Sequence, residues 1–181
     1  AVGADHNNSI HDTAFTSENL SLEGVKAIGT LRPMSNSDMG PRKVSLVADS
    51  HRWCNFQDSI VMCIFVPFNY EKTVEIIRAV TGWNTTVYEA MKVGERAIQL
   101  ARVYNLREGI GPEYDCLPER SSTPTSEGGI KGIYISKDKL RQALTYYYKE
   151  MGWSQKGVPE EYTLEKLEIG WAAKYLKELD Y

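Results

Sequence analysis

The sequence predicts an all-α protein, an irregular multi-helix domain with long loops. Two observations lead to this class. Beyond residue 40, apolar residues recur at the three- and four-residue spacing of a helix face, and most of these runs end at Gly or Pro. The 181 residues are 42% hydrophobic and 25% charged, which is the balance of one globular domain. The chain has no internal repeats and no heptads that would indicate another architecture.

Residues 1–40 predict an extended, loop-rich lead-in, because they are rich in Ser, Asn, Asp and Gly and their apolar residues follow no period. A short helical turn is expected after Ser21. Pro41 suits the first turn of a helix, where its missing N–H is not needed, and a broken apolar stripe predicts one or two helices over 41–64. We therefore divide the chain into this lead-in and a helical part, 41–181.

The next two helices have the clearest signals. Asn69 can cap a helix that stops at Gly82, since Asn suits the N-cap and Gly the position after the C-terminus. Thr86 and Glu89 form the pattern of a capping box, and the apolar residues behind them keep helical spacing until Gly109. These signals predict two consecutive, well-bounded helices.

The last part of the chain predicts a long loop over 109–132, and loops of that length are usually functional or disordered. Residues 133–135 (IYI) suggest a short strand, and apolar spacing predicts two final helices over 140–153 and 164–179. Three tryptophans are interpreted as core aromatics that anchor helix ends: Trp83, Trp153 and Trp171.

Charge and hydropathy exclude several classes of protein. The formal net charge of −3 argues against a nucleic-acid partner, which a basic stripe would indicate. No apolar run approaches the roughly 20 residues needed to cross a bilayer, so no membrane partner is expected. Residues 1–8 lack the regions of a signal peptide, and the chain does not begin with Met, so we expect a piece of a longer protein or a processed product. Three cysteines are too few for a disulfide framework, which favours a reducing, cytoplasmic setting.

Taken one by one, the candidate site residues are unspecific. Cys63 lies in an apolar run, where a free cysteine usually acts as a small hydrophobic residue. Asp58 can be a solvated helix residue or a cap, and His6 an ordinary exposed residue. The spacing of Cys54 and Cys63 is outside that of a zinc knuckle. From these residues alone, the chain is a soluble helical domain.

The order of several short segments is more informative. The GADH segment at 3–6 and the segment DSIVMCI at 58–64 are followed by matching segments at 81–84, 94–97, 101–109, 117–120, 146–153 and 164–168. In this order they resemble the C-terminal part of the tungsten-containing aldehyde:ferredoxin oxidoreductase family. The segment at 58–64 is similar to that family's second pterin-binding motif, Asp-x-x-Gly-Leu-Cys.

The resemblance implies a role for five residues. Cys63 falls on the fourth thiolate ligand of a [4Fe–4S] cluster, and clusters of this kind require thiolates. Asp58 falls on the carboxylate that accepts hydrogen bonds from a pterin, and Met62 and Ile64 on positions where the backbone touches it. His6 falls beside the tungsten, as a proton donor or acceptor.

The sequence also departs from the family pattern. Val2 and Asn8 stand where the family often has basic residues near pterin phosphates or metal-linked groups, so Asn8 is the cofactor-binding candidate at that place. Val61 replaces the motif's Gly, and because it is β-branched we expect ordinary backbone angles there. Cys116 stands where the family commonly has Thr and is not counted as a ligand. Cys54 has no counterpart, and core packing is the role expected of it.

The resemblance implies an enzyme that oxidises aldehydes to carboxylic acids and passes electrons to ferredoxin. It implies a tungstopterin (tungsten bis-molybdopterin) and a [4Fe–4S] cluster, with the other three cysteine ligands in N-terminal domains of the same enzyme, an anaerobic setting and a homodimer. The isolated chain is then expected to be inactive. Two alternatives stay open. One is a non-catalytic helical scaffold or fragment. The other is a relative that acts on acyl-thioester or aromatic substrates.

Overall fold

A computed structural model describes residues 8–9, 11–66 and 68–177, and within these the chain forms helices and no strands. The α-helices are α1 Leu20–Val25, α2 Pro41–Ser59, α3 Tyr70–Thr81, α4 Val87–Arg107, α5 Lys137–Glu150, α6 Glu161–Lys166 and α7 Lys174–Lys177. Short 3-10 turns lie between them at Asp12–Phe15, Lys26–Ile28, Pro112–Tyr114, Glu119–Ser122 and Gly170–Ala173. The predicted all-α class is confirmed.

The helix ends follow the local signals. The side chain of Asn69 accepts a hydrogen bond from the N–H of Lys72 at the start of α3, and Gly82 closes that helix with a φ of 74°. Thr86 and Glu89 form the complete capping box at the start of α4. A single helix, α2, covers most of the range in which one or two were predicted, and α1 covers the turn predicted after Ser21.

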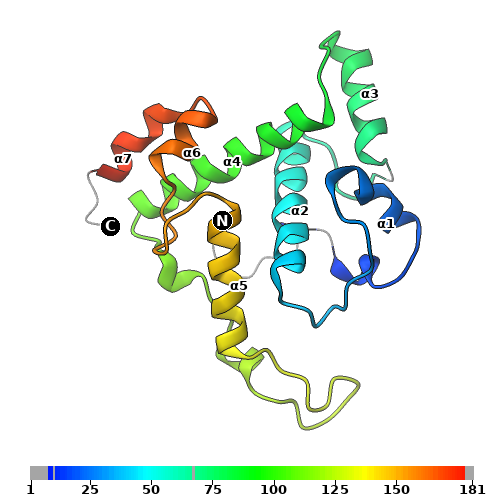
Figure 1. The fold of residues 1–181 in the computed structure, drawn as a ribbon, viewed down its shortest axis with the longest axis vertical. Helices are drawn as coiled ribbons and strands as arrows, with labels where there is room; N and C mark the ends of the chain where they lie inside the picture. The colour runs from blue at the N-terminus through cyan, green and yellow to red at the C-terminus, as the bar shows by residue number, and fades with distance from the viewer. Residues whose placement is uncertain (1–7, 10, 67, 178–181) are drawn as a thin grey trace.

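The two longest helices, α2 and α4, cross at close range (Figure 1). Gly94 of α4 lies against the backbone of α2, and a Cβ at this position would overlap the carbonyl oxygen of Arg52. Such a close approach of two backbones is one that only glycine permits. The crossing therefore fixes α2, which ends at the candidate site, against α4, the longest helix of the described residues.

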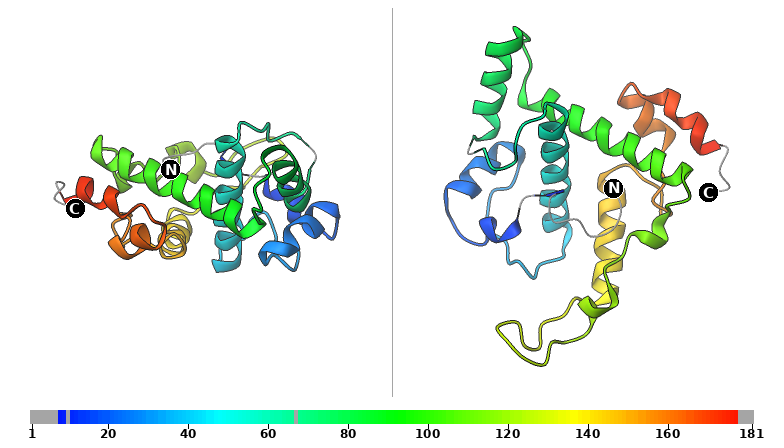
Figure 2. Two further views of the ribbon diagram at one scale, coloured as in Figure 1. Left: turned by 90° about the horizontal axis from the view of Figure 1, so that it is seen from above. Right: turned by 180° about the vertical axis from the view of Figure 1, so that it is seen from behind.

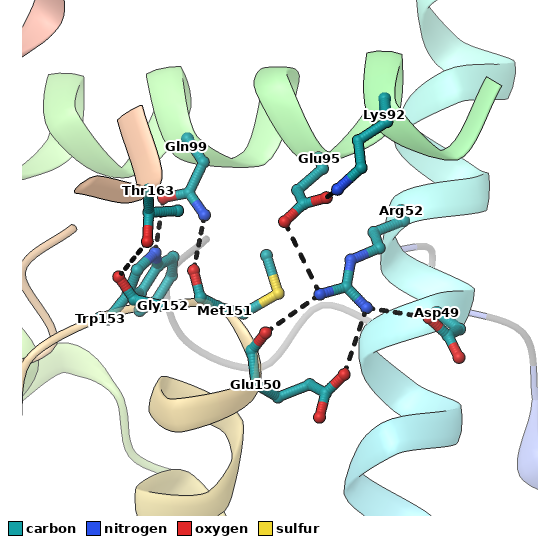
Figure 3. Close-up of polar contacts among 10 residues, drawn as sticks. All are labelled: Asp49, Arg52, Lys92, Glu95, Gln99, Glu150, Met151, Gly152, Trp153 and Thr163. Atoms are coloured by element: carbon teal, nitrogen blue, oxygen red, sulfur yellow. Dashed lines mark hydrogen bonds and ion pairs between the residues drawn. The ribbon is translucent and has the colours of Figure 1, made fainter. Parts of the chain in front are cut away.

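A buried arginine reinforces this crossing (Figure 3). Arg52 donates to Asp49 at 2.8 Å and to the backbone carbonyl of Glu150 at 3.1 Å, and its guanidinium lies 3.9 Å from Glu95. Burial lowers the pKa of Arg52, but these acidic neighbours raise it by more, so the guanidinium stays charged. The arginine therefore joins α2, α4 and the end of α5 through paired charges.

Three clusters of buried apolar side chains lie at different places along α4. The first joins the lead-in with α2, α3 and the first turn of α4, and the second packs α6 and the turn behind it against the C-terminal half of α4. The third lies between them, where α2 and α4 meet the end of α5. Figures 1 and 2 show this order, with α1 and α3 at one end of α4 and α6 and α7 at the other.

Three predictions about the fold are wrong. Residues 133–135 form no strand. The N–H of Ile135 donates to the carbonyl of Ser121, but this single bond is not continued into a ladder of strand hydrogen bonds. The helix predicted over 164–179 is interrupted. Glu168 takes a left-handed φ of 61°, and the N–H of Ile169 donates to the carbonyl of Leu164, which ends α6.

The third wrong prediction concerns the tryptophans. Trp153 is buried as predicted, but Trp83 and Trp171 are 69% and 59% exposed. In the described residues, no helix is both long and apolar enough to cross a membrane.

Candidate functional site

A hollow of approximately 380 Å³ lies where α2 ends and the following loop begins. Side chains from α2, from the loop after it and from the lead-in line it: Asn8, Cys54, Gln57, Asp58, Met62, Cys63, Ile64 and Phe65. Five of these are the described residues predicted to contact cofactors, four by the family resemblance and Asn8 at a place where the chain departs from the family pattern. The structure thus brings that set together around one space.

One wall of the hollow is a face of α2. Cys54, Gln57 and Asp58 are spaced by three and four residues, so their side chains leave the helix on the same side. Cys54 and Gln57 are 3% and 5% exposed, whereas Asp58 at the end of the helix is exposed. The wall therefore changes from a buried thiol to an accessible carboxylate over little more than one helical turn.

A Schellman motif closes α2 and turns the chain into the second wall. The N–H of Met62 donates to the carbonyl of Gln57 at 2.9 Å, and the N–H of Val61 donates to the carbonyl of Asp58 at 3.0 Å. These two bonds fix the start of the loop against the residues that line the helix wall. The relative positions of Asp58 and of Cys63 are thereby set by the backbone.

Val61 occupies the left-handed position of this motif, with a φ of 57°. The prediction of ordinary backbone angles there is wrong. The motif requires a left-handed residue to close the helix, and this is the place that glycine usually takes. The β-branched side chain is 92% exposed, so no packing contact offsets the unfavourable backbone angle. The left-handed backbone explains why the family pattern has glycine at this position, and this chain adopts the same backbone angle with valine.

The loop carries an exposed cysteine with free backbone groups beside it. Cys63 is exposed, and its carbonyl accepts from the N–H of Val66 at 3.1 Å in a tight turn. Among the hydrogen bonds of the described residues, none uses the N–H of Cys63 or of Ile64. Backbone donors at this wall are therefore open to a bound group. The interpretation of Cys63 as a packed hydrophobic residue does not fit its exposure.

The two cysteines at the hollow differ in chemistry. Burial and, to a smaller degree, the negative charge of Asp58 raise the pKa of the Cys54 thiol to about 11. Cys54 therefore remains a neutral thiol near pH 7, in agreement with the expected packing role. Metals bind the thiolate, and Cys63 on the exposed loop is the one accessible for that.

Some candidates lie elsewhere. His6 and Val2 lie outside the described residues. Cys116 is exposed in the loop before α5, and the hollow is lined by other residues. Among the described side chains, no three of His, Cys, Asp and Glu gather in a group that could hold a metal ion. Any cluster at this site would need ligands in addition to those described.

Sequence reasoning missed Gln57. Its side chain is buried and lines the hollow next to Asp58, but a glutamine in the middle of a polar stretch carries no signal of its own. The one signal available was its spacing of three residues from Cys54, which places both on one face of a helix.

Comparison with known proteins identifies relatives of this chain. The sequence profile described as aldehyde ferredoxin oxidoreductase, domains 2 and 3, matches residues 1–169. A tungsten-containing aldehyde ferredoxin oxidoreductase of Pyrococcus horikoshii is 32% identical over 133 residues, which are 71% of this chain and 21% of that protein. The protein of the same description from Pyrococcus furiosus is 35% identical over 117 residues, 62% of this chain and 19% of the relative.

Other proteins similar to this chain are described with different activities. An aliphatic sulfonate oxidoreductase, WOR-like subunit, of Pyrococcus furiosus is 32% identical over 131 residues, 68% of this chain and 21% of that protein. The active-site complex BamBC of benzoyl coenzyme A reductase, solved with 1,5-dienoyl-CoA, superposes with a TM-score of 0.67 at 18% identity over 99% of this chain and 28% of that one. It shares the fold. The chain spans about a fifth of the length of the curated relatives it matches.

Proposed function

This chain belongs to the aldehyde ferredoxin oxidoreductase family, and on that premise we propose that it supplies one wall of the cofactor site of a tungstopterin oxidoreductase. The enzyme would oxidise aldehydes to carboxylic acids and pass the electrons to ferredoxin. The observation that carries the proposal is the hollow at the end of α2. The described residues that are predicted to contact cofactors all line it: Asn8, Asp58, Met62, Cys63 and Ile64.

The chemistry of these groups fits the two cofactors. The Cys63 thiol is exposed and can bind one iron of a [4Fe–4S] cluster as a thiolate. The Asp58 carboxylate is a pure acceptor when ionised, which suits the N–H groups of a pterin. The N–H of Ile64 is without an acceptor among the described residues and can donate to the same ring system. Asn8 supplies a neutral amide where relatives often have a basic residue.

The cofactors, when bound, supply the transfer of two electrons and their passage onward one at a time. The residues of this chain hold and orient them. Oxidation of an aldehyde by water gives a carboxylic acid, two protons and two electrons, so a residue that moves protons is needed. His6 is proposed for this task, since an imidazole exchanges protons near neutral pH.

The rest of the site would come from outside this chain. A cubane cluster takes four thiolates, and this wall of the hollow offers one exposed cysteine. We place the other three ligands, and the greater part of the pterin site, in N-terminal domains of the same enzyme. Ferredoxin as electron acceptor, a homodimer and a cytoplasmic location complete the proposal.

Metal analysis of the full-length protein tests this function. We expect tungsten and about four irons per chain after anaerobic purification from the native source. Cys63→Ser should lower the iron content, and Cys116→Ser is the matched control, because Cys116 is also exposed but is not among the residues that line the hollow. A full-length protein without tungsten and iron would contradict the enzyme and leave a helical scaffold.

The substrate is tested separately, because the relatives named above differ in it. Reduction of a viologen dye would be compared for aldehydes, aliphatic sulfonates and acyl thioesters on the same preparation. Turnover of aldehydes above the other two classes is expected. Preference for a thioester or a sulfonate would leave the cofactor site in place and replace the proposed reaction.

A further inference from the structure

We propose that Gln57 is a second side chain, beside Asp58, that hydrogen-bonds the pterin bound in the hollow. This inference rests on the proposed function, because it assigns a further binding residue to the same site. The family motif begins at Asp58, one residue after Gln57. The assignment comes from the geometry of α2 and from the state of the Gln57 amide.

The side-chain amide of Gln57 makes no hydrogen bond among the described residues, although the residue as a whole is buried. Gln57 is 5% exposed and lines the hollow, and no hydrogen bond among the described residues uses its side chain. In the described residues, the fully buried side-chain atoms without partners are Nε of Arg52 and the hydroxyls of Tyr70 and Thr73. The Gln57 amide is not among them, so it keeps accessible surface, and the hollow is the space it lines.

Another glutamine shows what a structural amide looks like in this protein (Figure 3). Gln99 on α4 is fully buried, and both ends of its amide are used. Its nitrogen donates to the carbonyl of Met151 at 2.7 Å, and its oxygen accepts from the indole N–H of Trp153 at 2.7 Å. Gln57 has neither kind of bond. The contrast indicates that the partner of Gln57 is supplied when the hollow is filled.

The backbone holds Gln57 ready for a ligand. Its carbonyl accepts the N–H of Met62 in the Schellman motif, so both walls of the hollow meet at this residue. One residue on, the carbonyl of Asp58 accepts the N–H of Val61 and fixes the turn. A side chain on such a fixed segment loses less conformational entropy on binding than one on a free loop.

The lining of the hollow selects a neutral heteroaromatic ring. No Lys or Arg is among the described residues that line it, and the Asp58 carboxylate would repel a phosphate. An amide offers donors and an acceptor together, whereas a carboxylate only accepts. A pterin ring edge presents N–H donors next to carbonyl and ring-nitrogen acceptors. Asp58 and Gln57 together can satisfy both kinds of group.

The test uses the full-length holoenzyme with three variants. Gln57→Leu removes the amide, Asp58→Asn tests the proposed pterin site itself, and Gln99→Leu is the control for a structural glutamine. Pterin per chain is measured by fluorescence after oxidative release, and tungsten by plasma mass spectrometry. The unfolding midpoint of each cofactor-free variant is measured beside them.

We expect Gln57→Leu to lose pterin about five- to tenfold faster than wild type during dilution, the effect of one neutral hydrogen bond. Its cofactor-free unfolding midpoint should equal or exceed that of wild type, because no partner in the described chain loses a bond. Gln99→Leu should lower the midpoint, since it leaves the Trp153 N–H and the Met151 carbonyl without their partner.

The outcomes separate this inference from the proposed function. Pterin retention by Gln57→Leu at the wild-type rate, with loss from Asp58→Asn, would overturn the role of Gln57 and leave the site in place. A midpoint that falls in Gln57→Leu as far as in Gln99→Leu would also overturn it, because the amide would then bond protein. Wild-type protein without any pterin would overturn the proposed function itself.

Discussion

Replacing Val61 with glycine should stabilise this chain, although it removes a side chain and adds nothing. A non-glycine residue in the left-handed region costs roughly 1–2 kcal/mol, and Val61 has a φ of 57°. Glycine raises the entropy of the unfolded chain, which offsets about 0.5–1 kcal/mol of that gain. Because Val61 is 92% exposed, the change removes little buried surface.

The net gain is then about 1 kcal/mol, or a rise of about 2–4 °C in the unfolding midpoint for a chain of this size. Far-UV circular dichroism during thermal unfolding and a urea titration would measure both quantities. The hydrogen bonds from the N–H groups of Val61 and Met62 should persist, since they depend on the backbone alone.

The matched control is the same substitution in a helix. Val80 is 80% exposed in the last turn of α3, where the backbone is right-handed. Val80→Gly should lower stability by about 0.4 kcal/mol, from helix propensity alone. A Val61→Gly variant that melts at or below the wild-type temperature would refute the reasoning from backbone strain.

Further predictions concern the packing of the helices and the Cys54 thiol. Gly94→Ala should destabilise the chain by about 3 kcal/mol in a urea titration, because its Cβ would overlap the backbone of Arg52. Arg102→Met should cost about 3–5 kcal/mol, since Arg102 is fully buried and its guanidinium pairs with Asp115 at 2.8 Å, which would lose its cation. Cys54 should resist a thiol reagent at pH 8, at which the exposed thiols react, and mass spectrometry would identify it. Burial raises the pKa of the Cys54 thiol on folding from the ordinary 9.0 to about 11. The folded state therefore keeps its full stability below pH 9 and loses part of it as the pH rises to 11. The urea midpoint of the wild-type chain should fall over this range, and Cys54→Ala should lack this part of the fall.

Helix boundaries could be predicted where the signal lies within a few residues of the boundary. The Asn69 cap, the left-handed Gly82 and the capping box of Thr86 and Glu89 all lie where the sequence predicts them. Each of these depends on hydrogen bonds between near neighbours, which sequence spacing records directly.

Helix ends without glycine could not be predicted in this way. Val61 and Glu168 both take left-handed angles, φ 57° and 61°, although neither residue type favours them. At the second of these ends, Ile169 and Leu164 pack in one buried cluster, and this contact arises from the tertiary fold. The same limit explains Trp171, since spacing identifies an apolar residue but not the surface that covers it.

The candidate site was predictable in part. Periodicity alone leaves Asp58 and Cys63 as ordinary residues, and the family motif is what singles them out before the structure places them around one hollow. Neither source singles out Gln57, because what sets this residue apart is a side-chain amide without a hydrogen bond among the described residues. The positions of all surrounding residues are needed to show that its amide has no partner among the described residues, and sequence spacing does not supply them.

The arrangement of the buried clusters along α4 has a consequence for how the chain opens. Twenty-one residues of helix extend about 30 Å, too far for the cluster at one end to contact the cluster at the other. The α6–α7 end can therefore detach while α2 and its hollow stay folded. Amide hydrogen exchange should then separate two cooperative units, with slow exchange at the Met62 N–H and faster exchange at that of Ile169. The helix end that forms the site would belong to the more persistent unit.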